Sequence, residues 1–217
     1  FGVAADGAAF RDPFVAANLA RDLPTGAYRF EGEVPDAHLA TLGFLLGTYR
    51  FDRFLKKDAA DVRLVVPEGV DGEEVTRLAE GVRLARDLVN APANEMGPDE
   101  LEQAAAELAA RHAAQLHVVR GEELARGFPL IEAVGCSSPR APRLLDLTWG
   151  DAGHPRITIV GKGVCFDTGG LDLKPAAAML IMKKDMGGAA NALGLAHMIM
   201  DAGLPVRLRV LIPAVEN

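Results

Sequence analysis

The feature that most constrains the fold is an apolar segment, residues 157–160, which runs directly into the Gly-Lys-Gly of residues 161–163. Its length and β-branched composition predict a buried strand. A helical pattern follows at residues 185–200, and a second apolar strand is predicted at residues 206–213. A strand, a helix and a further strand in this order are typical of an α/β domain, in which ligands bind beyond the carboxyl ends of the strands. We therefore expect this glycine-rich loop to lie at a functional site.

The rest of the chain alternates between helical and strand patterns. Helices are predicted at residues 13–21, 36–47, 73–89, 98–114 and 122–126, and strands at residues 27–31, 61–66, 116–120 and 143–149. Asp36 is expected to cap the second of these helices. We expect the strand at 157–160 to pair with the strand at 143–149 across a turn at residues 150–155.

A cluster of proline and glycine at residues 67–72 predicts a boundary between two domains. Residues 1–72 would form a small N-terminal α/β domain. Residues 73–217 would form a larger α/β domain with a mixed, largely parallel central sheet. The chain begins at Phe1 and stops at Asn217, just after a strand-like run, so both ends look like cuts through a longer protein.

Composition argues against several classes of protein. Hydrophobic residues make up 49% of the 217 residues, which is enough for a sizeable core, and no apolar run approaches the length of a membrane span. The formal net charge of -7 lacks the basic excess of a nucleic-acid binder. Two cysteines, Cys136 and Cys165, do not form a disulfide framework and are consistent with a reduced, cytoplasmic protein. Neither a membrane nor a nucleic-acid partner is therefore expected.

Polar side chains around the glycine-rich loop suggest a metal site. Lys162, Asp167, Lys174 and Asp185 follow one another along this part of the chain, and residues 168–170, Thr-Gly-Gly, allow a tight turn beside the first aspartate. Asp185 is expected to begin the helix, and small residues in the first turn would hold it in close packing. Two carboxylates that converge on one crevice suit Mg, Mn or Zn.

Two phosphate-binding motifs resemble this segment but do not match it. A phosphate-binding P-loop would need glycine at position 156, which is Arg156, and a dinucleotide-binding loop would need glycine at position 166, which is Phe166, so both fail. A simpler alternative stays open, because lysine and aspartate are common on surfaces and Asp185 could merely cap its helix. No ligand spacing is visible among the histidines, which are His38, His112, His117, His154 and His197.

Three segments carry a resemblance to a known family. They are Val-Gly-Lys-Gly-Val-Cys-Phe-Asp-Thr-Gly-Gly at 160–170, Leu-Lys-Pro at 173–175 and Met-Lys-Lys-Asp-Met-Gly-Gly-Ala-Ala at 182–190. Together they resemble the metal-site motifs of the leucyl (cytosol) aminopeptidases. The likeness covers roughly residues 75–217, and residues 1–70 match only as a shortened N-terminal domain. Ala178, where many members have glycine, is a departure that lies outside the expected ligands.

The resemblance implies a metal-dependent aminopeptidase that releases N-terminal, preferably apolar and leucine-like, residues from peptides. Asp167, Asp185 and the neutral amine of Lys162 would bind metal, as two divalent ions, Zn or Mn, with Mg as a further candidate. Lys174 would stay charged and polarise the scissile carbonyl. Met182 would line the pocket for the first side chain of the substrate, although it could equally be a core methionine.

The resemblance also implies a cytoplasmic homo-oligomer, a hexamer. The family supplies further ligands from an Asn-Thr-Asp-Ala-Glu-Gly-Arg motif that would lie beyond Asn217, so the catalytic domain would be incomplete and the isolated chain inactive. An alternative from another class is a catalytically inactive member of the family that serves as a scaffold or binding protein.

Overall fold

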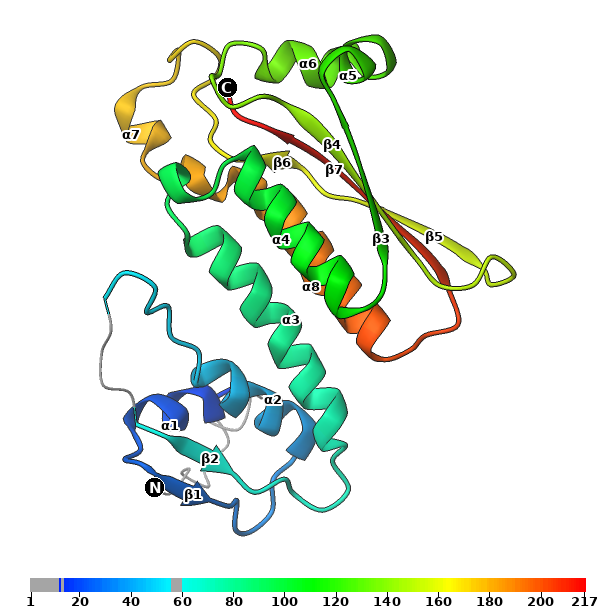
Figure 1. The fold of residues 1–217 in the computed structure, drawn as a ribbon. Coiled ribbons are helices and arrows are strands. Elements are labelled where there is room, and N and C mark those ends of the chain that lie inside the picture. Colours follow the sequence, from blue (N-terminus) through cyan, green and yellow to red (C-terminus); the bar gives the residue numbers. More distant parts are fainter. Residues whose placement is uncertain (1–11, 13, 56–59) are drawn as a thin grey trace. The chain divides into compact units, whose positions relative to one another are not determined.

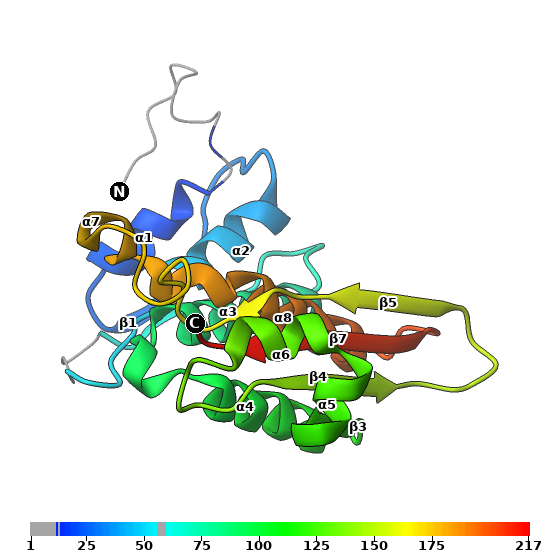
Figure 2. The ribbon, with the colours of Figure 1, turned by 90° about the horizontal axis from the view of Figure 1, so that it is seen from above.

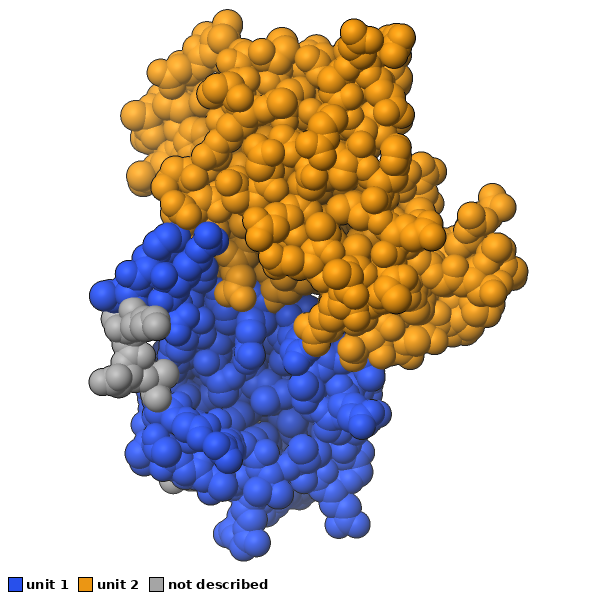
Figure 3. All heavy atoms as spheres, viewed as in Figure 1, with its two compact units in different colours: residues 1–83 blue, residues 84–217 orange. Residues whose placement is uncertain are grey.

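The computed structural model of the chain describes residue 12 and residues 14–55 and 60–217. The chain divides into two compact units, residues 1–83 and 84–217 (Figure 3). The division falls within helix α3, Gly72–Asn90, whose first residue is the last residue of the predicted N-terminal domain. Within the described residues, no helix combines the length and the apolar character that crossing a membrane requires.

The first unit contains two helices and a two-stranded parallel sheet. Its elements before α3 are α1 (Ala16–Asp22), β1 (Gly26–Tyr28), α2 (Ala37–Gly47) and β2 (Val62–Leu64). The helices pack through a small buried core of Ala16, Ala20, Ala40 and Phe44. The predicted cap is confirmed, since the Asp36 carboxylate accepts the backbone N–H of Leu39 at 2.8 Å. The predicted start of the first helix, at residue 13, lies outside the described residues.

The second unit is built around a mixed sheet of five strands. Its helices after α3 are η2 (Ala93–Glu95), α4 (Pro98–Arg111), α5 (Gly121–Gly127), α6 (Pro129–Gly135), α7 (Ala176–Met179), η3 (Met182–Met186) and α8 (Gly187–Asp201). Its strands are β3 (Gln115–Arg120), β4 (Arg143–Trp149), β5 (Arg156–Val160), β6 (Gly163–Val164) and β7 (Arg207–Val215). The predicted α/β class is confirmed.

The strands lie in the order β3-β4-β7-β5, and β6 also pairs with β7 (Figures 1 and 2). β5 and β6 run parallel to β7, whereas β4 runs antiparallel to both β7 and β3. The apolar side chains of β7, such as Leu208, Val210 and Ile212, are buried. Helices α4 and α8 pack along this sheet, α4 against β3 and β4, and α8 against β5 and β7.

The predicted hairpin between β4 and β5 is wrong, because β7 lies between them. β7 is nine residues long and pairs with β4 from Arg143↔Ala214 onward and with β5 from Arg156↔Arg207 onward. The edge of β4 that would face β5 is therefore occupied. β5, α8 and β7 instead form a parallel strand–helix–strand unit, the connection that parallel strands require.

The start of α8 also differs from the prediction. Asp185 does not begin the α-helix; it lies in the tighter 3₁₀ turn η3, and the α-helix starts at Gly187. In the first turn of α8 the backbone N–H of Ala189 donates to the carbonyl of Lys162 at 2.9 Å. The beginning of the helix is thus docked on the glycine-rich loop, which ties the position of Asp185 to that of Lys162.

Candidate metal centre

Two glycines allow the loop after β5 to approach the start of α8 closely. A Cβ atom added at Gly161 would lie 2.7 Å from the Cα of Ala189, and one added at Gly188 would lie 2.8 Å from the backbone nitrogen of Lys162. Only residues without a side chain fit between these two backbones. The close approach places Lys162 next to Asp185.

Lys162 and Asp185 form the first of two lysine–carboxylate pairs. The Nζ of Lys162 lies 2.6 Å from the Oδ2 of Asp185, and the Nζ of Lys184 lies 3.6 Å from the other carboxylate oxygen. The Asp185 side chain is only 12% exposed, and among the described residues its Oδ2 atom has no partner with hydrogen-bond geometry despite the short ion pair. A buried carboxylate is costly in a folded protein unless a cation neutralises it, and here the Lys162 ammonium group does so.

Asp167 and Lys174 form the second pair. The Nζ of Lys174 lies 2.7 Å from the Oδ2 of Asp167, whose Oδ1 accepts the backbone N–H of Gly169 at 2.8 Å. The hydrogen bond from Lys174 holds the pKa of Asp167 well below its usual range, with a smaller contribution from Gly169. A turn through Gly169 and Gly170, at φ of +81° and +86°, closes this arrangement.

The remaining predicted residue, Met182, lies beside the second pair. Its Sδ atom is 3.6 Å from the Nζ of Lys174, and it begins the 3₁₀ turn η3 that also carries Asp185. Among the described residues, no hydrogen bond or ion pair links the first lysine–carboxylate pair directly to the second. η3 therefore provides the connection between them, through Met182 on one side and Asp185 on the other.

The donor set fits a divalent cation. Each carboxylate faces an ammonium group, so positive charge already occupies the position that a cation would take. Carboxylate oxygens suit Mg, Mn and Zn, and an amine nitrogen suits Zn or Mn when it is neutral.

Several supporting residues were not identified from the sequence. Asn217 accepts the backbone N–H of Thr168 through its Oδ1 at 2.7 Å and so fixes the turn that follows Asp167. Lys183 donates to the carbonyl of Asn90 at 2.7 Å, and its neighbour Lys184 faces Asp185. No spacing in the sequence signals these contacts, because their partners are remote or are backbone atoms.

The contacts of Glu216 and Cys165 indicate structural roles for these two side chains. Glu216 accepts from the Ser138 hydroxyl at 3.0 Å and pairs with Arg140 at 3.4 Å, which also donates to the carbonyl of Ala93. Cys165 is buried, and burial raises the pKa of its thiol to about 12. It therefore has the surroundings of a packed side chain rather than of a nucleophile.

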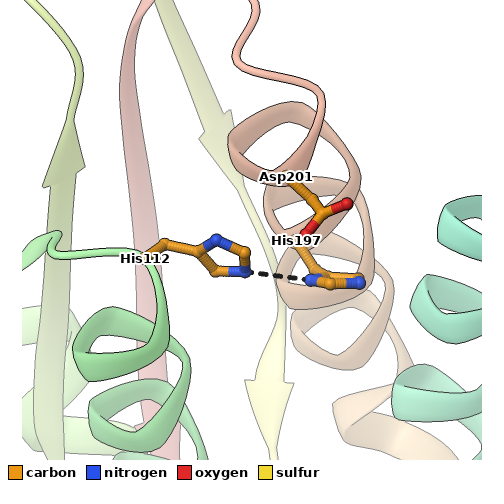
Figure 4. Close-up of side chains that lie close together, drawn as sticks. All are labelled: His112, His197 and Asp201. Carbon is orange, nitrogen blue, oxygen red and sulfur yellow. Dashed lines mark hydrogen bonds between the residues drawn. The ribbon is translucent and has the colours of Figure 1, made fainter. Parts of the chain in front are cut away.

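Two histidines that are far apart in the sequence lie close together in the structure. His112 and His197 are 85 residues apart in the chain, yet Nε2 of His112 lies 3.0 Å from Nδ1 of His197. Asp201 lies next to them (Figure 4), and one ligand atom from each of the three side chains falls within 4.8 Å of the others. The sequence shows no ligand spacing between these histidines, because it is folding that places the ends of α4 and α8 together.

Comparisons with known proteins identify the family and the relatives that this chain resembles. The model of the cytosol aminopeptidase family, catalytic domain, matches residues 83–217, and that of the M17 aminopeptidase N-terminal domain matches residues 3–67. A probable cytosol aminopeptidase of Syntrophotalea carbinolica is 40% identical over 192 residues, which cover 81% of this chain and 39% of that protein. One from Geobacter is 36% identical over 219 residues, with coverages of 93% and 43%.

Solved structures also align with almost the whole of this chain. The crystal structure of a cytosol aminopeptidase from Coxiella burnetii aligns with a TM-score of 0.90 and 45% identity, and covers 96% of this chain and 46% of that one. The bottromycin maturation enzyme BotP in complex with Mn aligns with a TM-score of 0.84 and 34% identity, with coverages of 96% and 48%. This chain therefore spans somewhat less than half the length of these relatives.

Proposed function

Because this chain belongs to the cytosol aminopeptidase family, we propose that it supplies the first part of a two-metal site that removes N-terminal residues from peptides. The observation that carries this proposal is the buried carboxylate of Asp185, whose Oδ2 atom lies 2.6 Å from the Lys162 amine. Such an atom is suited to direct coordination of a cation.

Each polar side chain of the centre would have a distinct role. Asp167, Asp185 and the neutral amine of Lys162 would hold the two divalent ions, whose chemistry is to activate a water molecule at neutral pH. Lys174 would leave its ion pair with Asp167 and direct its charged Nζ at the carbonyl oxygen of the scissile bond, where negative charge develops. Met182, 3.6 Å from that Nζ, would contact the first side chain of the substrate and favour an apolar one.

Charge balance suggests that these residues do not complete the centre. Two divalent ions carry four positive charges, and Asp167 with Asp185 supplies two negative ones. Among the described residues, neither carboxylate belongs to a cluster of three His, Cys, Asp or Glu side chains that could share a metal, and Glu216 is bound to Ser138 and Arg140. We infer that further carboxylates come from outside these 217 residues and that the chain alone has no peptidase turnover.

The proposal also covers the bound metals, the cellular location, the oligomeric state and the substrates. Zn or Mn would be the bound ions, with Mg as a further candidate, and the Mn in the BotP complex supports Mn. The names of the relatives support a cytoplasmic location. A hexamer is proposed from the family resemblance alone. Peptides are the proposed substrates.

A direct experiment uses a full-length protein that contains this chain. Asp167→Asn and Asp185→Asn each remove a charged ligand without changing its shape, so both should lose bound metal and nearly all hydrolysis of a leucine amide. Asp172→Asn, which alters an exposed aspartate of the same loop, is the matched control and should keep both. Full metal content and turnover in the first two variants would refute the proposal. Metal binding without turnover in the unaltered protein would favour an inactive family member.

A further inference from the structure

The ends of α4 and α8 bring together three side chains that can bind a metal. His112 directly follows α4, and His197 and Asp201 lie four residues apart on α8, so they project from the same face of that helix (Figure 4). The two imidazole nitrogens are 3.0 Å apart, and the ring centroids are separated by 5.2 Å. His197 is buried, His112 is half-buried and Asp201 is exposed, so the group opens to solvent on the carboxylate side.

Two imidazole nitrogens and one carboxylate oxygen form a ligand set for borderline divalent metals such as Zn²⁺, Co²⁺ and Ni²⁺. Nitrogens 3.0 Å apart would each lie about 2.1 Å from an ion at an N–metal–N angle of about 90°. A tetrahedral angle requires the nitrogens to be about 3.4 Å apart, so a shift of a few tenths of an ångström suffices. The ion would replace the proton that the two rings share, and that proton would leave to solvent.

The electrostatic surroundings also favour a cation. α4 and α8 run side by side in the same direction, and both end at this cluster (Figure 1). The last carbonyl groups of both helices place partial negative charge here. Burial, followed by His197 and Arg111, lowers the pKa of His112, and Asp201 acts in the opposite direction. The net effect favours the neutral imidazole, which is the form that binds a metal.

We propose that His112, His197 and Asp201 bind one divalent transition-metal ion, separate from the candidate metal centre, that ties the end of α4 to the end of α8. α8 runs from Gly187 to Asp201, so His197 and Asp201 lie about 15 Å and about 21 Å along the helix from its first residue, which follows the turn that carries Asp185. The ion would act as a structural clip. It would hold α8 in register with α4 while the other end of α8 packs against Lys162.

Zinc binding by the 217-residue chain tests the proposal. Equilibrium dialysis against Zn²⁺ near neutral pH, followed by metal analysis, gives the number of ions bound and their affinity. His112→Ala and Asp201→Asn should each weaken one class of site by at least about tenfold, since even the loss of a supporting partner of a ligand costs about 10–100-fold. His154→Ala, an exposed histidine in the β4–β5 turn, is the matched control and should bind as the unaltered chain does.

Two further measurements separate this site from the proposed catalytic one. Asp185→Asn should leave the histidine site intact, and the double variant Asp185→Asn/His112→Ala should lose both classes of site. In the unaltered chain, Zn²⁺ should shift the ring ¹⁵N resonances of His112 and His197 and leave those of His154 unchanged, a result that does not depend on how any variant folds. Unchanged His112 and His197 resonances, or equal zinc affinity in His112→Ala, Asp201→Asn and the unaltered chain, would overturn the proposal.

Discussion

Gly161→Ala tests the close approach on which the candidate metal centre depends. The added methyl group would lie 2.7 Å from the Cα of Ala189 and 2.8 Å from the carbonyl oxygen of Gly188. Both are backbone atoms of α8, which cannot turn away as the end of a side chain can. Since ordinary carbon contacts lie at about 3.5–4.0 Å, loop and helix would have to separate by roughly 1 Å.

Overpacking of this kind destabilises a protein by about 1–3 kcal/mol, and about 1.4 kcal/mol corresponds to a tenfold change in the folded-to-unfolded ratio. Urea unfolding followed by circular dichroism measures the loss in free energy of unfolding. Gly127→Ala is the matched control, because no atom lies within 4 Å of the added Cβ, and it should change stability by less than about 0.5 kcal/mol. Identical unfolding midpoints for Gly161→Ala and the unaltered chain would refute the reasoning.

Three other predictions concern the charged pairs and the activity of the chain. In a full-length protein, Lys174→Ala should lower kcat by roughly a hundred- to thousandfold with metal content intact, whereas Lys162→Ala should lose bound metal. Metal analysis together with kinetics distinguishes the two variants. Retained turnover in both would contradict the roles proposed for the two lysines. The depressed pKa of Asp167 stabilises the fold above the unfolded-state value of about 3.9, and this contribution is lost as pH falls toward the folded-state pKa. Asp167→Asn should therefore show a smaller fall in unfolding free energy between about pH 5 and pH 2 than the unaltered chain, and equal falls would exclude the ion pair as the cause. The 217-residue chain supplied with Zn or Mn should not hydrolyse a leucine amide, and robust turnover would show that it completes the site itself.

Local sequence signals predicted local structure well. The strand at 143–149 has the predicted bounds, because a leucine-rich segment ends there at a glycine turn. The Asp36 cap was predictable because an N-cap depends only on the next three residues. The four polar residues around the glycine-rich loop were proposed from the chemistry of their side chains and the motif that surrounds them, and the structure places them in two lysine–carboxylate pairs.

Long-range contacts account for what the sequence did not predict. The pairing of β4 with β7 rather than β5 depends on a strand that comes almost 60 residues later, and no local pattern encodes that choice. Asp185 lies in a 3₁₀ turn because the first turn of α8 bonds to the carbonyl of Lys162. The pair of His112 and His197 joins residues 85 apart, and only the four-residue spacing of His197 and Asp201 on a predicted helix could have suggested it.

Anomalous diffraction from crystals of a full-length protein with Mn or Zn bound tests the central claim most directly. The account predicts an ion about 2.0–2.2 Å from a carboxylate oxygen of Asp185 and from the Nζ of Lys162, a second ion close by, and Lys174 Nζ outside the coordination shell of both. The ion pair between Lys162 and Asp185 would then be replaced by bonds to metal. An intact ion pair at these residues, with no anomalous peak beside Asp185 in protein that is active and loaded with metal, would contradict it.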